Sequence, residues 1–212
     1  MIRYCTETLK LPSALAGALL LASCGPLISF GDDGPADDVY TLHYQGPLKS
    51  ESPTGPIIYV DSPQMVEGLD GQGITVRIEQ NRRTTLAGSI WSAHLSDLVR
   101  DYVTLALGAV SDANLVGGGG LDIKAGCRLG TKVWAMDYVP GTTAGEDRVE
   151  LAIQFSLVRL SDSKLLSHPT FSETVRVETA NGRGIVAAFE AAMGSAAEKY
   201  GRWFNAESGA CG

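Results

Sequence analysis

The stretch RVELAIQFSLVRL at residues 148–160 decides the fold class of this chain. Apolar and polar residues alternate along it, which is typical of a strand with one buried face. The apolar residues that share this face are Val149, Leu151, Ile153, Phe155 and Leu157. Ser161-Asp162-Ser163 follows and suits a hairpin turn, and a second β-type stretch covers residues 164–177. The pattern therefore predicts antiparallel strands with one face covered.

Further β-type stretches precede this hairpin. They cover residues 39–44, 57–60, 74–78, 84–86 and 131–139. Residues 84–86 are expected to pair back with 74–78 across the turn at 80–83, and Ile74, Val76 and Ile78 share a face. Residues 45–56, rich in Pro and Gly, predict a loop. Residues 111–120, which end in four consecutive glycines, predict a flexible connection.

Two other stretches have helical spacing. In the first, apolar residues three and four apart are Trp91, Leu95, Leu98, Tyr102 and Leu105, with Ser89 as the expected cap and Gly108 near the end. In the second they are Ile185, Phe189, Ala192, Ala196, Tyr200 and Trp203. The sequence therefore predicts an α/β (α+β) domain over residues 39–207. It should contain a single mixed, mostly antiparallel sheet with two amphipathic helices packed on one face.

Composition and charge exclude several classes of function. The chain has 212 residues, enough for one ordinary domain, and its net charge of -7 is a poor match for nucleic acid. The histidines, His43, His94 and His168, lack the spacing of a metal site, so neither a metal nor a cofactor is expected. Asp97 and Asp101 fit a solvated helix face better than acid–base catalysis. We do not expect an enzyme.

The N-terminus has the pattern of a secretory signal. Arg3 and Lys10 precede an uncharged apolar run at residues 11–22, too short for an ordinary membrane span. The run ends in Leu21-Ala22-Ser23-Cys24-Gly25, which resembles the lipobox of bacterial lipoproteins. The resemblance implies that residues 1–23 are removed and that Cys24 is acylated; otherwise Cys24 is an ordinary apolar residue near a signal cut. Residues 24–38, rich in Gly, Pro and Asp, predict a flexible tether.

Four short motifs follow one another in the mature chain. They are Tyr40-Thr41-Leu42, the strand 57–60 with Pro63 after it, Leu69-Asp70-Gly71, and Trp91-Ser92-Ala93 with Leu95 nearby. Their order resembles the ABC-type transport auxiliary lipoproteins, the family of paraquat-inducible protein C. The resemblance implies a non-catalytic partner of an ABC permease and a mammalian-cell-entry (MCE) domain protein. The cargo would be phospholipid or another apolar molecule that moves between the inner and outer membranes.

The location follows from the residue after the acylated cysteine. Gly25 stands where Asp retains lipoproteins at the inner membrane in the best-known sorting system. We therefore expect anchoring in the outer membrane on its periplasmic side, with inner-membrane anchoring as the alternative. A homo-oligomer is left open. The alternative function is a structural or assembly lipoprotein for lipopolysaccharide export or envelope integrity, without a transport role.

Two assignments of individual residues stay open at this point. Trp91, Tyr102 and Trp203 are candidates for contact with a lipid or a partner, but their helical spacing favours core packing. Cys127 and Cys211 remain once Cys24 is acylated, and an oxidising compartment would allow a disulfide between them. Against this bond, Cys211 lies at a chain end, where residues often fray, and Cys127 would also suit a small apolar position.

Overall fold

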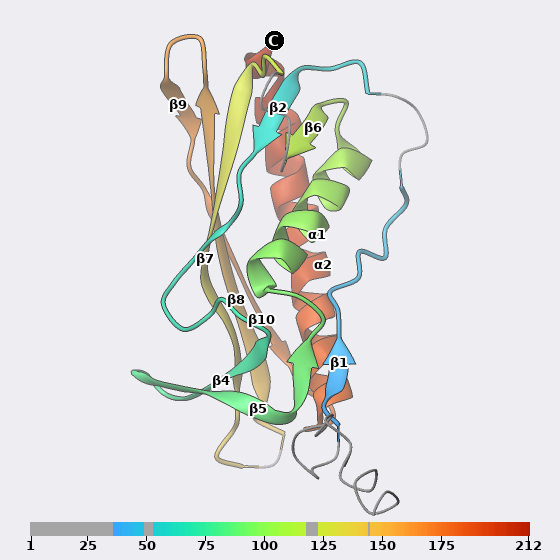
Figure 1. Ribbon diagram of the computed structural model, residues 1–212, viewed down its shortest axis with the longest axis vertical. Coiled ribbons are helices and arrows are strands. Elements are labelled where there is room, and N and C mark those ends of the chain that lie inside the picture. Colours follow the sequence, from blue (N-terminus) through green and yellow to red (C-terminus); the bar gives the residue numbers. More distant parts are fainter. Residues whose placement is uncertain (1–35, 49–52, 118–122, 144) are drawn as a thin grey trace, which may run out of the picture. The chain divides into compact units, whose positions relative to one another are not determined.

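The computed structural model describes residues 36–48, 53–117, 123–143 and 145–212. The predicted signal at 1–23, Cys24 and the tether up to residue 35 lie outside the described residues. The compact unit Ala36–Gly212 contains one ten-stranded sheet within these described ranges. Two long helices lie on the same side of its longest strands (Figure 1). The predicted fold class, a single mixed sheet with two helices on one face, is confirmed, and the sheet is not closed.

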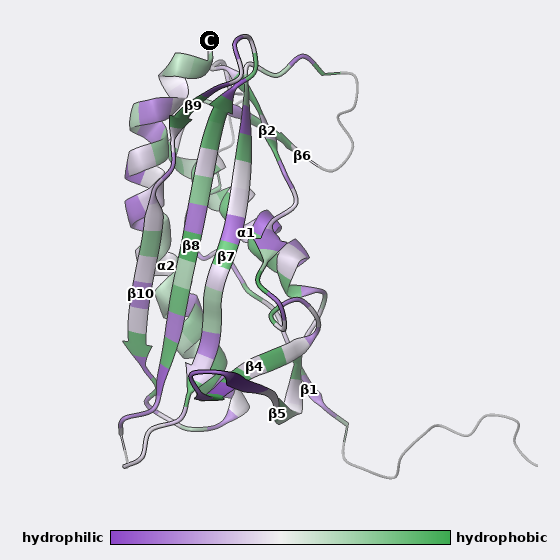
Figure 2. Ribbon diagram, turned by 90° about the vertical axis from the view of Figure 1, so that its left-hand side faces the viewer, coloured by the Kyte–Doolittle hydropathy of each residue, from purple (hydrophilic) through white to green (hydrophobic). Residues whose placement is uncertain are grey.

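Four strands form the antiparallel centre of the sheet. They are β7 (Cys127–Val139), β8 (Arg148–Arg159) and β10 (Thr170–Arg176), with β9 (Lys164–Ser167) also paired to β8. Every second residue of β8 from Val149 to Leu157 is buried, and Figure 2 shows the matching alternation of hydropathy along the strand. The turn at 161–163 is present, and Ser163 adopts a φ of 56° there. Residues 164–177 form two strands instead of one, because Pro169 has no backbone N–H to continue the ladder.

Six other strands complete the sheet. They are β1 (Asp38–Tyr40), β2 (Ile57–Val60), β3 (Gln64–Met65), β4 (Gly73–Glu79), β5 (Arg82–Trp91) and β6 (Asn114–Gly117). The strands β2, β3 and β4 run parallel to successive parts of β7, and β6 runs parallel to β2. The predicted pairing of 74–78 with 84–86 is confirmed by Thr75 opposite Thr85. The long pairings are thus antiparallel and the short ones mostly parallel.

The first helix begins later than its spacing predicts. Helix α1 spans Leu95–Val110, whereas Ser89 and Trp91 belong to β5. These residues pair in parallel with β1, and the N–H of Trp91 donates to the carbonyl of Gln72 at 2.6 Å. The prediction that Ser89 caps the helix is therefore wrong, because long-range pairing holds residues 89–91 extended. Leu105 also leaves the predicted buried stripe and is 45% exposed.

Three other predictions need correction. The connection at 111–120 contains β6, since its residues 114–117 find a partner in β2. Residues 118–120 of that connection lie outside the described residues. The predicted strand 39–44 ends at Tyr40, where the pairing with β5 stops. Ile78 lies near the hairpin end and is 45% exposed, unlike the buried Ile74 and Val76.

Helix α2 (Gly182–Glu207) follows the last strand, and a short 3-10 helix (Ser208–Cys211) ends the domain. The side chain of Asn181 accepts a hydrogen bond from the N–H of Gly184 at 2.9 Å and so caps the first turn. The core lies between the helices and the sheet. Its largest fully buried side chains include Trp91, Phe155, Phe189, Tyr200 and Phe204.

Candidate functional site: the groove between the helices

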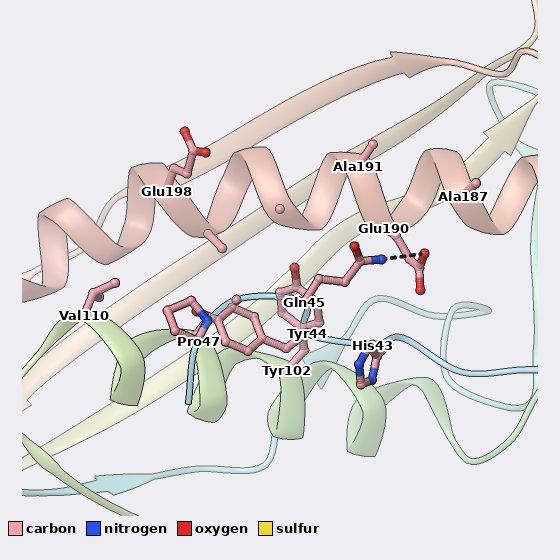
Figure 3. Close-up of a pocket in the computed structure, with 14 residues that line it drawn as sticks. His43, Tyr44, Gln45, Pro47, Tyr102, Val110, Ala187, Glu190, Ala191 and Glu198 are labelled. Carbon is pink, nitrogen blue, oxygen red and sulfur yellow. Dashed lines mark hydrogen bonds between the residues drawn. The ribbon is translucent and has the colours of Figure 1, made fainter. Parts of the chain in front are cut away.

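A groove of about 640 Å³ lies between α1, α2 and the chain segment 43–47. In Figure 3 this segment runs between the two helices, with Tyr44 and Tyr102 close together. The groove exists because α2 turns its larger apolar residues toward the core and leaves small ones along the gap. The lining residues that α1 supplies are Tyr102, Ala106 and Val110. Those from α2 are Ala187, Glu190, Ala191, Gly194, Ala197 and Glu198.

The segment 43–47 is held by contacts to both helices. The rings of Tyr44 and Tyr102 meet edge to face, with centroids 5.6 Å apart. The side-chain amide of Gln45 donates to Glu190 of α2 at 3.5 Å. Gly46 packs against the Tyr44 hydroxyl so closely that a Cβ there would overlap it. Any other residue at position 46 would require the Tyr44 ring to shift.

The polar side chains of the groove are two tyrosine hydroxyls, two carboxylates, the His43 imidazole and the Gln45 amide. Burial is the main cause that raises the pKa of Tyr102 to about 12, and the neighbouring Tyr44 and Glu190 raise it further. Burial also raises the pKa of Tyr44. Both hydroxyls are therefore protonated at neutral pH and can donate hydrogen bonds. Among the described residues that line the groove there is no Lys or Arg.

The structure separates the three aromatic residues suggested by the sequence. Trp91 is 1% exposed and packs against Phe189, with ring centroids 5.8 Å apart, so it belongs to the core. Trp203 stacks on Phe155 and donates from its indole nitrogen to the Ser167 hydroxyl at 2.9 Å. Tyr102 lines the groove. Lipid or partner contact thus stays a proposal for Tyr102, while Trp91 and Trp203 have structural partners.

Sequence reasoning missed the small residues of the groove. Ala187, Ala191, Gly194 and Ala197 are spaced four, three and three along α2, on the side away from its apolar stripe. This spacing is a signal that the sequence contains. Its meaning depends on α1 and segment 43–47, which come from distant parts of the chain.

The predicted cysteine pair consists of the first residue of β7 and the last residue of the 3-10 helix. The structure places the sulfurs of Cys127 and Cys211 at bonding distance, with the Cα atoms 5.3 Å apart. This separation is inside the usual range for a disulfide. Gly126 allows the approach, because a Cβ there would overlap the carbonyl of Cys211. The pairing is compatible with the fold, and its presence in the protein stays a prediction.

A second hollow, of about 610 Å³, lies on the sheet face away from the helices. Trp134 sits at a bulge in β7, between Val133 and Ala135, and is 43% exposed. Its indole donates to Gln154 at 3.2 Å, and the Lys132 ammonium lies 3.8 Å from its ring centroid. A bulge commonly re-aims a side chain in this way. This hollow is more polar than the groove between the helices, which is therefore the better candidate for an apolar ligand.

The candidate polar residues have separate surroundings. His43 lines the groove, His168 lines the second hollow, and His94 precedes α1 with Nδ1 3.9 Å from Asp70. Arg100 forms ion pairs with both Asp97 and Asp101. In the described ranges, no three His, Cys, Asp or Glu side chains gather as a metal site would require.

Among the helices of the described ranges, none has the length and apolar character that a membrane span needs.

Solved structures share this fold at low sequence identity. A protein from Xanthomonas campestris matches with a TM-score of 0.68 and 16% identity, over 80% of this chain and 95% of that one. An uncharacterized protein matches with a TM-score of 0.63 and 12% identity, over 80% and 99% of the two chains. A hypothetical protein from Chlamydia trachomatis matches at 0.51 and 3% identity, over 72% and 99%. A comparison with curated proteins gives no match. These likenesses establish the fold alone.

The family is established by the sequence match. A model of the ABC-type transport auxiliary lipoprotein component matches residues 40–199. This range runs from β1 through most of α2, so it contains both walls of the groove. Because the match covers more than half of the chain, the protein belongs to the family of ABC-type transport auxiliary lipoprotein components.

Proposed function

We propose that the protein is a non-catalytic auxiliary component of an ABC/MCE-type transport system that moves phospholipid or other apolar cargo between the inner and outer membranes. Its partners are an MCE-domain protein and an ABC permease of the same system. The observation that carries the proposal is the apolar groove between α1 and α2, within the range matched by the transport family. Concave apolar sites with a few polar groups are the usual form of small-ligand sites.

The anchor and the location belong to the same proposal. Cys24 at the end of the apolar run supports acylation, and Gly25 supports sorting to the outer membrane. A diacylglyceryl group with a further acyl chain would hold the protein stably, because stable anchoring needs more than one chain. The domain would then face the periplasm. Density-gradient fractionation should place the protein with outer-membrane markers, and recovery only with inner-membrane markers would contradict this location.

Affinity isolation of the tagged full-length protein tests the partnership. The envelope of its own bacterium is treated with a cleavable cross-linker before solubilisation, and the captured proteins are identified by mass spectrometry. An MCE-domain protein and an ABC permease should be enriched over a control capture with an unrelated tagged lipoprotein. Enrichment of lipopolysaccharide-export or envelope-assembly proteins in their place would favour the structural or assembly role and contradict the transport role.

A further inference from the structure

The α2 wall of the groove is smooth and apolar. Ala187, Ala191, Gly194 and Ala197 succeed one another along it, and none has a side chain that extends beyond Cβ. Ala106 and Val110 of α1 face the same space. Each methylene group of a ligand buried on such a surface contributes about 0.8 kcal/mol. The wall therefore favours a ligand with a long hydrocarbon portion.

The segment 43–47 limits what can enter. It already lies between the helices, where Tyr44 contacts Tyr102 of α1 and Gln45 contacts Glu190 of α2 (Figure 3). A partner helix with its side chains is about 10–12 Å wide and would have to displace this segment. An extended hydrocarbon chain is much narrower. The volume of about 640 Å³ is that of a small-molecule site.

The hydroxyl of Tyr102 is a second, independent sign of a ligand. Tyr102 is 4% exposed, and its hydroxyl makes no hydrogen bond to any described residue. A Cβ built on Gly194 would lie 3.9 Å from this hydroxyl, so the missing side chain at position 194 leaves the hydroxyl open to the groove. A tyrosine hydroxyl that faces a groove can donate a hydrogen bond to a ligand in that groove. A ligand carbonyl there would take the place of water as the acceptor.

The charges along the groove restrict the headgroup of a ligand whose hydrocarbon portion lies in the groove. Glu190 and Glu198 both line it, two turns apart on α2, with no Lys or Arg among the described lining residues. Two carboxylates repel a headgroup with net negative charge. They attract an ammonium group, as in phosphatidylethanolamine, whose headgroup is zwitterionic.

We infer that the groove holds one acyl chain of a zwitterionic phospholipid, whose ester carbonyl accepts a hydrogen bond from the Tyr102 hydroxyl. The chain lies along Ala187, Ala191 and Gly194, and the headgroup ammonium faces Glu198, which lies beyond Gly194 on α2. This inference rests on the proposed function, because it names the cargo and the surface that contacts it. Gly194 is the residue that keeps the hydroxyl accessible to this cargo.

Site-specific photocrosslinking in intact cells tests the inference on the full chain. Cells grown with [³²P]orthophosphate produce the protein with Ala187→p-benzoylphenylalanine, and after irradiation the tagged protein is purified under denaturing conditions. The diacylglyceryl anchor expected at Cys24 contains no phosphate, so label on the protein does not come from the anchor. Mass spectrometry of the cross-linked peptide distinguishes phospholipid from lipopolysaccharide, which also contains phosphate. The control carries the same photoprobe at Ser172, an exposed residue of β10. Position 187 should acquire several-fold more label than position 172.

Two variants connect the label to the groove. Gly194→Leu, which fills the space over the Tyr102 hydroxyl, should reduce the label at position 187 at least fivefold. The matched control is Gly108→Leu, because Gly108 lies in α1, does not line the groove and has no atom within 4 Å of a Cβ built on it. Tyr102→Phe removes only the hydroxyl and should reduce the label about fivefold, the usual effect of one hydrogen bond. Thermal unfolding of each purified variant confirms that it is folded.

The outcomes distinguish a failure of the lipid site from a failure of the proposed transport function. Equal label at positions 187 and 172, label unchanged by both Gly194→Leu and Tyr102→Phe, or a cross-linked peptide in place of lipid would each overturn the site. Mass spectrometry of the cross-linked peptide should identify phosphatidylethanolamine, and a predominance of phosphatidylglycerol would overturn the zwitterionic assignment. Label at position 187 without an associated MCE protein or permease would overturn the proposed function and leave the site intact. Association with these partners but no label at position 187 would overturn the site and leave the proposed function intact.

Discussion

Arg83 of the β4–β5 hairpin and Asp137 of β7 form an ion pair across the sheet. Nε of Arg83 lies 2.9 Å from Oδ1 of Asp137, and a terminal nitrogen of Arg83 lies 3.3 Å from Oδ2. The Asp137 side chain is fully buried, whereas that of Arg83 is 33% exposed. The pair joins residues 54 positions apart in sequence. It therefore fixes where the hairpin lies against the central strand.

Removing Arg83 should destabilise the fold. Arg83→Ala leaves the Asp137 carboxylate buried without its partner, and we expect the free energy of unfolding to fall by about 2–4 kcal/mol. Arg82→Ala is the matched control, because its ion pair with Glu79 is mostly exposed, and it should cost less than about 1 kcal/mol. Urea unfolding measures the free energy of unfolding of both variants. A double variant with Asp137→Asn should lose less than the sum of the two single changes, and strict additivity would show that the pair is not coupled.

Glu150 should make stability depend on pH in the acid range. Burial by itself would raise the pKa of Glu150, but the hydrogen bonds from Arg77 and Arg148 outweigh it and lower the pKa below 4.5. The stabilisation by the ionised carboxylate is therefore present above the unfolded-state pKa and is lost as the pH falls through the folded-state value. Glu150→Gln should flatten the stability curve below about pH 4.5. An unchanged slope, equal to that of the exposed control Glu79→Gln, would contradict this role.

The disulfide between Cys127 and Cys211 should be found in the exported protein. A bond across 84 residues restricts the unfolded chain and is expected to contribute about 4–5 kcal/mol. Mass spectrometry of a digest under non-reducing conditions should show one linked peptide pair. The double variant Cys127→Ala/Cys211→Ala should unfold at a lower urea concentration than the oxidised protein. Recovery of two thiols that alkylate freely without reductant would rule the bond out.

Tyr200 should tolerate the loss of its hydroxyl. The side chain is fully buried, and its hydroxyl has no hydrogen-bond partner among the described residues. Burial raises the pKa of Tyr200 well above 10, so the group remains neutral. Tyr200→Phe keeps the packing against Phe155 and should leave the free energy of unfolding unchanged or raise it by about 1 kcal/mol. A loss greater than 1 kcal/mol in thermal or urea unfolding would indicate that the hydroxyl has a partner, such as a bound water.

Cys24 should carry the lipid anchor. Cys24→Ala removes the thiol that would be acylated, so the variant should accumulate as a precursor that incorporates no labelled palmitate. A serine substitution at the same position should behave in the same way, because the reaction needs the sulfur nucleophile. Palmitate label equal to that of the unchanged protein would place the lipid elsewhere.

The groove shows why a site is harder to predict than a strand. The sequence contains Tyr102 on a helix and small residues on another helix, but nothing in either pattern says that the two surfaces face each other. Trp91 and Trp203 match the same helical criteria as Tyr102, yet they lie in the core or against Ser167. The difference arises because α1 begins at Leu95 and segment 43–47 crosses between the helices. These are contacts between residues far apart in the chain.

Local patterns by themselves determined four features, because each pattern depends on neighbours in sequence. Alternating apolar residues determined β8 and the hairpin of β4 and β5, Ser161-Asp162-Ser163 determined the turn, and apolar residues three and four apart determined the second helix. The order of motifs also determined the family, which the match over residues 40–199 confirms. Only the tertiary structure decided that residues 89–91 are extended and that 114–117 form a strand, since both pair with distant segments. It likewise decided which face of α2 meets α1, and hence where the groove lies. Backbone pairing and side-chain packing across the chain override local spacing because they satisfy hydrogen bonds and bury apolar surface that no single segment can satisfy or bury alone.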